Sequence, residues 1–175
     1  MHILKIVIII ILYSFCCINI YEENNKKEKT FIETPLINIK NESIEQPIGN
    51  ISIEKIKLNK PLYNINSKRN NIEENITILE NSIEPSNNNS IMFLAAHSGP
   101  DPIAYFDNLD KLSINDIITL TYKNKKYYYI IKDIWETNKD GNIEVIKESS
   151  NQLILTTCSK NNNKQLIINS IKKES

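Results

Sequence analysis

Short runs of β-branched and aromatic residues, each ended by turn-forming residues, recur along most of this 175-residue chain. Residues 51–58 alternate apolar and polar side chains, and residues 91–96 form a continuous apolar run. The runs 117–122 and 126–131 are separated only by residues 123–125, which predicts a β-hairpin. This composition and periodicity are typical of β-strands and leave little room for amphipathic helices.

Other segments extend this pattern in both directions along the chain. Further extended or strand segments are expected at 61–63, 143–146, 152–157 and 165–171, a helical turn over 104–112, and a short helix or irregular segment over 72–83. The total is seven or eight short strands at hairpin spacing. The sequence therefore predicts a mostly β fold, in the form of a closed or nearly closed β-barrel with short helices.

The N-terminal segment has a different character from the rest of the chain. Residues 3–20 are almost wholly apolar, interrupted by Lys5 and Asn19, and a membrane span needs roughly 20 such residues. The bulky residues 15–19 make a poor signal-peptidase site, so an uncleaved anchor over residues 1–21 is favoured over a cleaved signal. We expect a single-pass protein of the cell membrane, with its N-terminus inside and the rest of the chain extracytoplasmic.

Two further segments follow this expected anchor. Residues 22–47 are polar and charged with little apolar periodicity, which predicts a stalk. Residues 48–175 form the predicted folded domain. The formal net charge of +0 gives no electrostatic pull toward nucleic acid, so no nucleic-acid partner is expected.

One cysteine and one histidine stand out in the predicted domain. Cys16 and Cys17 lie in the expected anchor, which leaves Cys158 as a free thiol or an intermolecular link. His97 is the domain's one histidine, and each of these two residues follows an apolar run and begins a polar loop. A thiolate beside an imidazolium is a competent nucleophile. The alternatives are an inert buried cysteine and an ordinary surface histidine.

Four segments of the chain resemble, in the same order, those of the bacterial sortase family. Leu155-Thr156-Thr157-Cys158 resembles the strand that delivers the sortase nucleophile, and Ala95-Ala96-His97-Ser98-Gly99 resembles the family's histidine segment. Residues 105–120 are similar to the element between these motifs, and residues 56–63 are similar to the early strand that leads into a Pro-hydrophobic-Tyr stretch. The resemblance covers about residues 48–171.

The resemblance implies an eight-stranded sortase-type β-barrel and a cysteine transpeptidase. Cys158 would attack a Leu-Pro-x-Thr-Gly-like sorting signal on a surface protein, and His97 would transfer protons. The acceptor would be an amine of a cell-wall precursor or of a pilin-type subunit. Thr157, Ala96 and Ser98 would lie against the substrate, and no metal or organic cofactor is implied.

The sequence departs from the family pattern at one position of the site. Sortases place an arginine on the strand after the cysteine, but the chain's one arginine is Arg69, in an early polar loop. Gln165 aligns with the usual position and Lys164 is next to it. A glutamine amide can donate a hydrogen bond to an oxyanion without adding charge. A lysine supplies charge but lacks the paired N–H donors of arginine's planar guanidinium group. The site would be a variant one, a slower one or an inactive one.

An active transpeptidase has two alternatives. A papain-like or amidase hydrolase is disfavoured, because such enzymes usually present the cysteine before the histidine in the chain. A non-catalytic, sortase-like peptide binder remains open if Gln165 cannot replace the arginine. The short loops suit small class D-like or housekeeping sortases, whereas the subclass, the sorting motif and any calcium dependence stay open.

Overall fold

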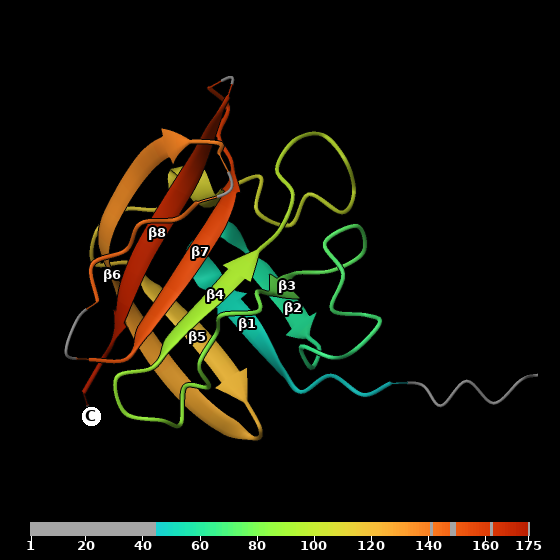
Figure 1. Cartoon of the computed structure of the whole chain (residues 1–175), viewed down its shortest axis with the longest axis vertical. Helices are drawn as coiled ribbons and strands as arrows, with labels where there is room; N and C mark the ends of the chain where they lie inside the picture. The colour runs from blue at the N-terminus through green and yellow to red at the C-terminus, as the bar shows by residue number, and fades with distance from the viewer. Residues whose placement is uncertain (1–44, 141, 148–149, 162, 175) are drawn as a thin grey trace, which may run out of the picture. The chain divides into compact units, whose positions relative to one another are not determined.

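The computed structural model describes residues 45–140, 142–147, 150–161 and 163–174. Within these residues, eight strands form one sheet in the order β2-β1-β5-β6-β8-β7-β4-β3, as Figure 1 shows. The elements are β1 (Gly49–Ile53), η1 (Glu54–Ile56), β2 (Leu58–Leu62), β3 (Thr77–Ile78), β4 (Ile91–Ala95), η2 (Leu109–Lys111), β5 (Ile117–Tyr122), β6 (Lys125–Asn138), β7 (Gln152–Cys158) and β8 (Lys164–Lys172).

The first predicted strand, 51–58, is wrong as a single element. The chain instead makes a tight hairpin, in which the 3₁₀ turn η1 separates β1 from β2 and Ile53 pairs with Leu58. Lys57 adopts a left-handed conformation with φ of 54°, and such a residue reverses the chain direction. Alternation over 51–58 was a correct sign of strand structure but could not reveal this reversal.

The hairpin predicted between residues 122 and 126 is confirmed. Tyr122 pairs with Lys125, so Lys123 and Asn124 form a two-residue connection. Both have positive φ, 47° and 62°, as a type I′ turn requires, and this turn matches the right-handed twist of the flanking strands. The long strand β6 then pairs with β5 along one part and with β8 along the other.

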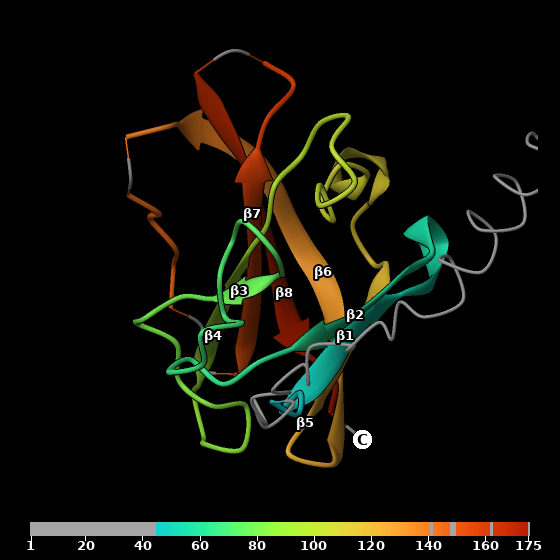
Figure 2. The same cartoon turned by 90° about the vertical axis from the view of Figure 1, so that its right-hand side faces the viewer.

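The two edges of the sheet meet, which nearly closes it into a barrel. β4 runs parallel to β7 and carries the short edge strand β3 on its other side. A single parallel bridge, Leu62 to Ile76, joins the end of β2 to the residue before β3. Figure 2 shows the sheet curling around its own interior. The prediction of a nearly closed, mostly β barrel is therefore confirmed.

Alternate residues of the strands fill the barrel interior. Ile51, Leu94, Leu120, Leu155 and Ile168 are fully buried there and belong to one apolar cluster. Successive side chains of a strand point to opposite faces, so the neighbours of these residues lie on the outside of the barrel. This parity determines which side chains share a face with Cys158.

The connection between β6 and β7 crosses the outer faces of β8 and β7 in Figure 1. The side-chain amide of Gln165 donates to the carbonyl of Asn142 at 2.8 Å, and that of Gln152 donates to the carbonyl of Ile146 at 2.9 Å. The strand predicted at 143–146 is wrong, because residues 142–147 carry no strand pairing. The carbonyls of residues 142 and 146 accept hydrogen bonds from side-chain amides, whereas a strand would pair with the backbone of a neighbouring strand.

The remaining expected elements are short or lie elsewhere in the chain. η2 provides the helical turn expected within 104–112, and residues 72–83 are irregular apart from β3. None of the helices in the described part of the chain has the length and apolar character to cross a membrane. The anchor predicted at 1–21 and nearly all of the predicted stalk at 22–47 lie outside the described residues.

Candidate active site

Parallel pairing of β4 with β7 brings Cys158 and His97 together. The two strands pair up to Ala95 and Thr156. Cys158 ends β7 and His97 lies two residues beyond the end of β4, so both are at the same end of these two neighbouring strands. Two residues far apart in the sequence therefore occupy adjacent positions at one edge of the barrel.

Side-chain hydrogen bonds hold the two strand ends in this alignment. The hydroxyl of Thr157 donates to the carbonyl of Ala96 at 2.8 Å, and the hydroxyl of Ser98 donates to the carbonyl of Cys158 at 2.6 Å. The amide of Phe106 donates to the carbonyl of His97 at 3.0 Å. Thr157, Ala96 and Ser98, predicted to lie against the substrate, here fix the backbone on either side of the cysteine and histidine.

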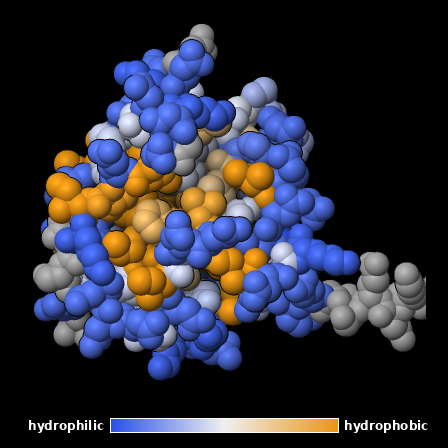
Figure 3. Space-filling model, viewed as in Figure 1, coloured by the Kyte–Doolittle hydropathy of each residue, from blue (hydrophilic) through white to orange (hydrophobic). Residues whose placement is uncertain are grey.

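Strand parity places the cysteine on the outer face of the barrel. Leu153 and Leu155 of β7 belong to the interior cluster. Ile154, Thr156 and Cys158 therefore point outward. On β4 the same rule puts Phe93 and Ala95 outside. In Figure 3 apolar side chains gather at the centre of the face that Figure 1 presents, with hydrophilic residues around them.

A small cavity of about 230 Å³ adjoins Cys158 at the end of the barrel. Its lining includes Ser98, Phe106, Asp107, Thr157 and Leu166. Cys158 is a free thiol and is half-buried. The thiol lies where this cavity meets the outer face of the barrel.

A lysine that the sequence did not single out lies against the thiol. The Nζ atom of Lys139, one residue beyond β6, is 3.1 Å from the Sγ atom of Cys158. Lys139 is one of many lysines in the chain. Nothing in the local sequence distinguishes it from the other lysines, so its proximity to Cys158 could not be deduced.

Glu136 organises the loop that follows the nucleophile. Its carboxylate accepts hydrogen bonds from the hydroxyl of Ser159 and, at 2.8 and 2.9 Å, from the amide of Asn161. The hydrogen bond from Ser159, then that from Asn161 and the charge of Lys164, lower the pKa of Glu136 below its ordinary value. Lys160 of the same loop forms an ion pair of 2.6 Å with Asp110.

The two predicted replacements for the usual arginine are both near the site but bonded elsewhere. Gln165 pairs directly with Cys158 across β7 and β8, while its side-chain amide donates to the Asn142 carbonyl. Lys164 is exposed and lies 4.0 Å from the carboxylate of Glu136. Arg69 stacks over the ring of Tyr63, with 4.2 Å between the guanidinium carbon and the ring centroid.

The imidazole of His97 has a carboxylate neighbour. Its Nε2 atom lies 3.4 Å from Glu73, and the side chains are 35% and 72% exposed. Such an exposed contact contributes little to stability. The Glu73 carboxylate provides a partner of opposite charge for a protonated His97 imidazole. The sequence did not predict this contact.

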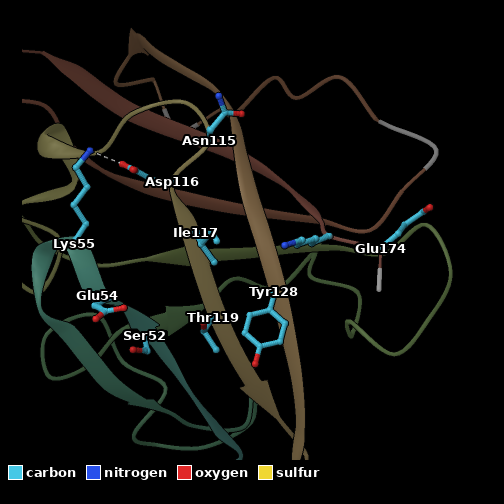
Figure 4. Close-up of a pocket in the computed structure, with 10 residues that line it drawn as sticks. Ser52, Glu54, Lys55, Asn115, Asp116, Ile117, Thr119, Tyr128 and Glu174 are labelled. Carbon is cyan, nitrogen blue, oxygen red and sulfur yellow. Dashed lines mark hydrogen bonds and ion pairs between the residues drawn. The ribbon is translucent and has the colours of Figure 1, made fainter.

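A larger groove lies away from this edge. It has a volume of about 860 Å³ and includes Ser52, Thr119 and Tyr128, on β1, β5 and β6 respectively. Figure 4 shows the ion pair of 2.7 Å between Lys55 and Asp116 at its border. Its lining contains none of the predicted site residues. In the described part of the chain, no group of three or more His, Cys, Asp or Glu is placed to hold a metal ion.

Comparisons with known proteins agree with this geometry. The model of the sortase domain family matches residues 51–171. The structure is similar to that of sortase C1 from Streptococcus agalactiae, with 27% identity, a TM-score of 0.64, and coverage of 74% of this chain and 68% of the other. No curated protein sequence matches the chain.

Two more distant structures share the fold. Sortase A from Corynebacterium diphtheriae, a lid mutant, is 22% identical with a TM-score of 0.65, over 74% of this chain and 72% of the other. Sortase C from Clostridium perfringens SM101 is 21% identical with a TM-score of 0.60, over 74% and 71%.

Fold and site together define a β-barrel protein that presents a cysteine beside a histidine at the ends of two parallel strands. With a family match over most of the described domain, the chain belongs to the sortase family.

Proposed function

We propose that this protein is a cysteine transpeptidase that cleaves a Leu-Pro-x-Thr-Gly-like sorting signal and transfers the surface protein to an amine. The observation that carries the proposal is the alignment of Cys158 with His97 by β4 and β7, within a sortase domain. A nucleophile and a proton-transfer partner at adjacent strand ends are the two groups that acyl transfer requires.

The first half-reaction would form a thioester. The Cys158 thiolate attacks the carbonyl carbon of the scissile bond, a C–S bond forms, and the carbonyl electron pair moves onto oxygen. When the tetrahedral intermediate collapses, the C–N bond breaks and protonated His97 donates its proton to the departing amine. In the second half-reaction an acceptor amine attacks the thioester, His97 takes its proton, and Cys158 leaves as a thiolate.

The outer face beside the cysteine supports a peptide substrate. On this face Phe93 of β4 is partly exposed, whereas Ala95 of β4 and Ile154 and Thr156 of β7 are buried. An extended peptide with apolar residues ahead of its scissile bond would bury them against Phe93. The acceptor would be an amine of a cell-wall precursor or of another protein subunit.

The proposed location follows from the N-terminal sequence. Residues 1–21 would anchor the chain in the cell membrane, with residues 22–47 as a stalk and the domain outside the cytoplasm. This arrangement would hold the site close to surface proteins as they are exported.

The test is peptide cleavage by the purified full-length chain. A Leu-Pro-x-Thr-Gly peptide with a fluorophore and a quencher is incubated with and without a triglycine acceptor, and products are identified by mass. Cleavage with formation of the Thr-triglycine product is expected, and both are lost in Cys158→Ala. Equal cleavage by Cys158→Ala would contradict the proposal. Peptide binding without turnover in the unaltered protein would instead identify a non-catalytic sortase-like binder.

A further inference from the structure

The contact between Lys139 and Cys158 brings a positive charge to the thiol sulfur. The separation of 3.1 Å between Nζ and Sγ is within hydrogen-bonding distance for sulfur. A cation next to a cysteine favours the thiolate over the thiol, and the thiolate is the nucleophilic form. Lysine keeps three donor hydrogens in its ammonium form and can direct one at the sulfur.

The sheet places Lys139 there by pairing three strands in a row. Thr137 of β6 pairs with Gln165 of β8, which pairs with Cys158 of β7. Lys139 is two residues beyond Thr137, so strand parity puts its side chain on the same outer face as Cys158. Its amide donates to the Asn163 carbonyl at 3.0 Å, which extends the β6–β8 alignment past the last paired residues.

The other cations near this edge are engaged with carboxylates. Lys160 pairs with Asp110 at 2.6 Å, and Lys164 lies 4.0 Å from Glu136. The ion pairs found among the described residues do not include Lys139. The ammonium group of Lys139 therefore lies against the sulfur, while those of Lys160 and Lys164 face carboxylates.

We propose that Lys139 is the cationic catalytic residue of this site and fills the role left open by the absence of an arginine on β8. The proposal rests on the function proposed above. The ammonium group stabilises the Cys158 thiolate, then the oxyanion that forms when the thiolate attacks the substrate carbonyl. Lys139 keeps all its protons throughout, and His97 carries the proton to the leaving amine.

The first test measures the thiol itself and needs no sorting signal. The full-length chain is treated with iodoacetamide, and alkylation is followed by mass on the peptide that contains Cys158, apart from Cys16 and Cys17. Near neutral pH, Lys139→Met and Lys139→Gln are expected to slow alkylation about 5–10-fold, because the sulfur loses its neighbouring positive charge. Lys139→Arg is expected to retain a rate close to that of the unaltered protein.

Lys126→Met is the matched control, because Lys126 is an exposed lysine near the start of β6, the strand that Lys139 follows. It is expected to alkylate at the unaltered rate. Thermal unfolding of every variant verifies that the fold is kept. Alkylation of folded Lys139→Met or Lys139→Gln at the rate of Lys126→Met would overturn the proposal.

The second test measures turnover and separates the two proposals. Lys139→Met is expected to lower kcat for the sorting peptide about 10–100-fold with KM changed less than about 3-fold, as for loss of an oxyanion contact. If the unaltered protein turns over no peptide, the transpeptidase proposal fails, while the alkylation rates still decide whether Lys139 acts on the sulfur. Turnover that is unaffected in Lys139→Met would overturn the role of Lys139 alone.

Discussion

The hydroxyl of Ser98 donates a hydrogen bond of 2.6 Å to the backbone carbonyl of Cys158. Ser98 follows His97 directly in the chain, so this bond ties the histidine segment to the cysteine segment beyond the last paired residues of β4 and β7. The register of the two strands alone would allow their ends to separate. The bond from Ser98 holds the predicted nucleophile and its proton-transfer partner at one spacing.

Removal of this hydroxyl should reduce catalysis more than stability. Ser98→Ala is expected to lower kcat for sorting-peptide cleavage about 10-fold, because misplacement of reacting groups is costly. Its unfolding free energy should fall by about 1 kcal/mol, the usual contribution of one hydrogen bond. Steady-state kinetics and urea unfolding give the two values. Ser52→Ala, on β1 away from the site, is the control, and equal kinetics for both variants would contradict the prediction.

The loop after Cys158 should loosen at acid pH through Glu136. Hydrogen bonds from Ser159 and Asn161 lower the pKa of Glu136 below 4.5. A carboxyl whose pKa is lower in the folded state stabilises that state above its unfolded pKa, and this contribution disappears as the pH falls through the folded pKa. The unaltered protein should therefore exceed Glu136→Gln in thermal stability at neutral pH, and the difference should shrink below about pH 4.5. Melting curves between pH 7 and pH 3 measure this difference, and a constant difference would contradict the prediction.

Tyr129 should be replaceable by phenylalanine without loss of stability. Its ring is fully buried, and within the described residues its hydroxyl has no hydrogen-bond partner. A buried hydroxyl without a hydrogen-bond partner has lost its bonds to water and gained none, which destabilises the folded state. Tyr129→Phe should therefore be as stable as the unaltered protein or up to about 1 kcal/mol more stable at pH 7. Urea unfolding measures this, with the exposed Tyr128→Phe as the control. A loss above about 1 kcal/mol would indicate that the hydroxyl has a stabilising contact.

The buried Tyr129 side chain should also affect stability at alkaline pH. Burial, and then the nearby Tyr127, raise the pKa of Tyr129 above its ordinary value of 10.0. A raised pKa means that the neutral form is favoured in the folded state, so stability is lost as the pH rises beyond the unfolded value. The unaltered protein should lose more stability than Tyr129→Phe between pH 9 and pH 12, as measured by melting temperature at roughly one-unit intervals. Parallel losses in the two proteins would count against this effect.

Gly49 should tolerate no side chain. A Cβ atom built on Gly49 would lie 2.0 Å from the backbone oxygen of Thr121 on β5, and backbone cannot move aside as a flexible side chain can. Gly49→Ala is expected to destabilise the domain by about 2–3 kcal/mol. The neighbouring Asn50→Ala should change the unfolding free energy by less than about 1 kcal/mol. Chemical denaturation measures both, and similar values would show that β1 and β5 can separate there.

Local residue patterns predicted the elements that depend on local geometry. The hairpin at Lys123 and Asn124 was recognisable because two strand-like runs are separated by a very short connection. The reversal at Lys57 was not, because a lysine carries no strong preference for the left-handed conformation it adopts there. The prediction of a strand at 143–146 was wrong because this segment lies against the outer faces of β7 and β8, where it bonds to side-chain amides and not to a strand backbone.

The sequence by itself determined that the domain is mostly β and that His97 and Cys158 each end an apolar strand, since strand propensity and turn residues act over a few neighbouring positions. Only the tertiary structure decided which strand ends meet. The parallel pairing of β4 and β7 put His97 beside Cys158, and the β6–β8–β7 row put Lys139 against the sulfur. Contacts between segments distant in the chain depend on how the whole sheet closes to bury its interior, and no local pattern encodes that choice.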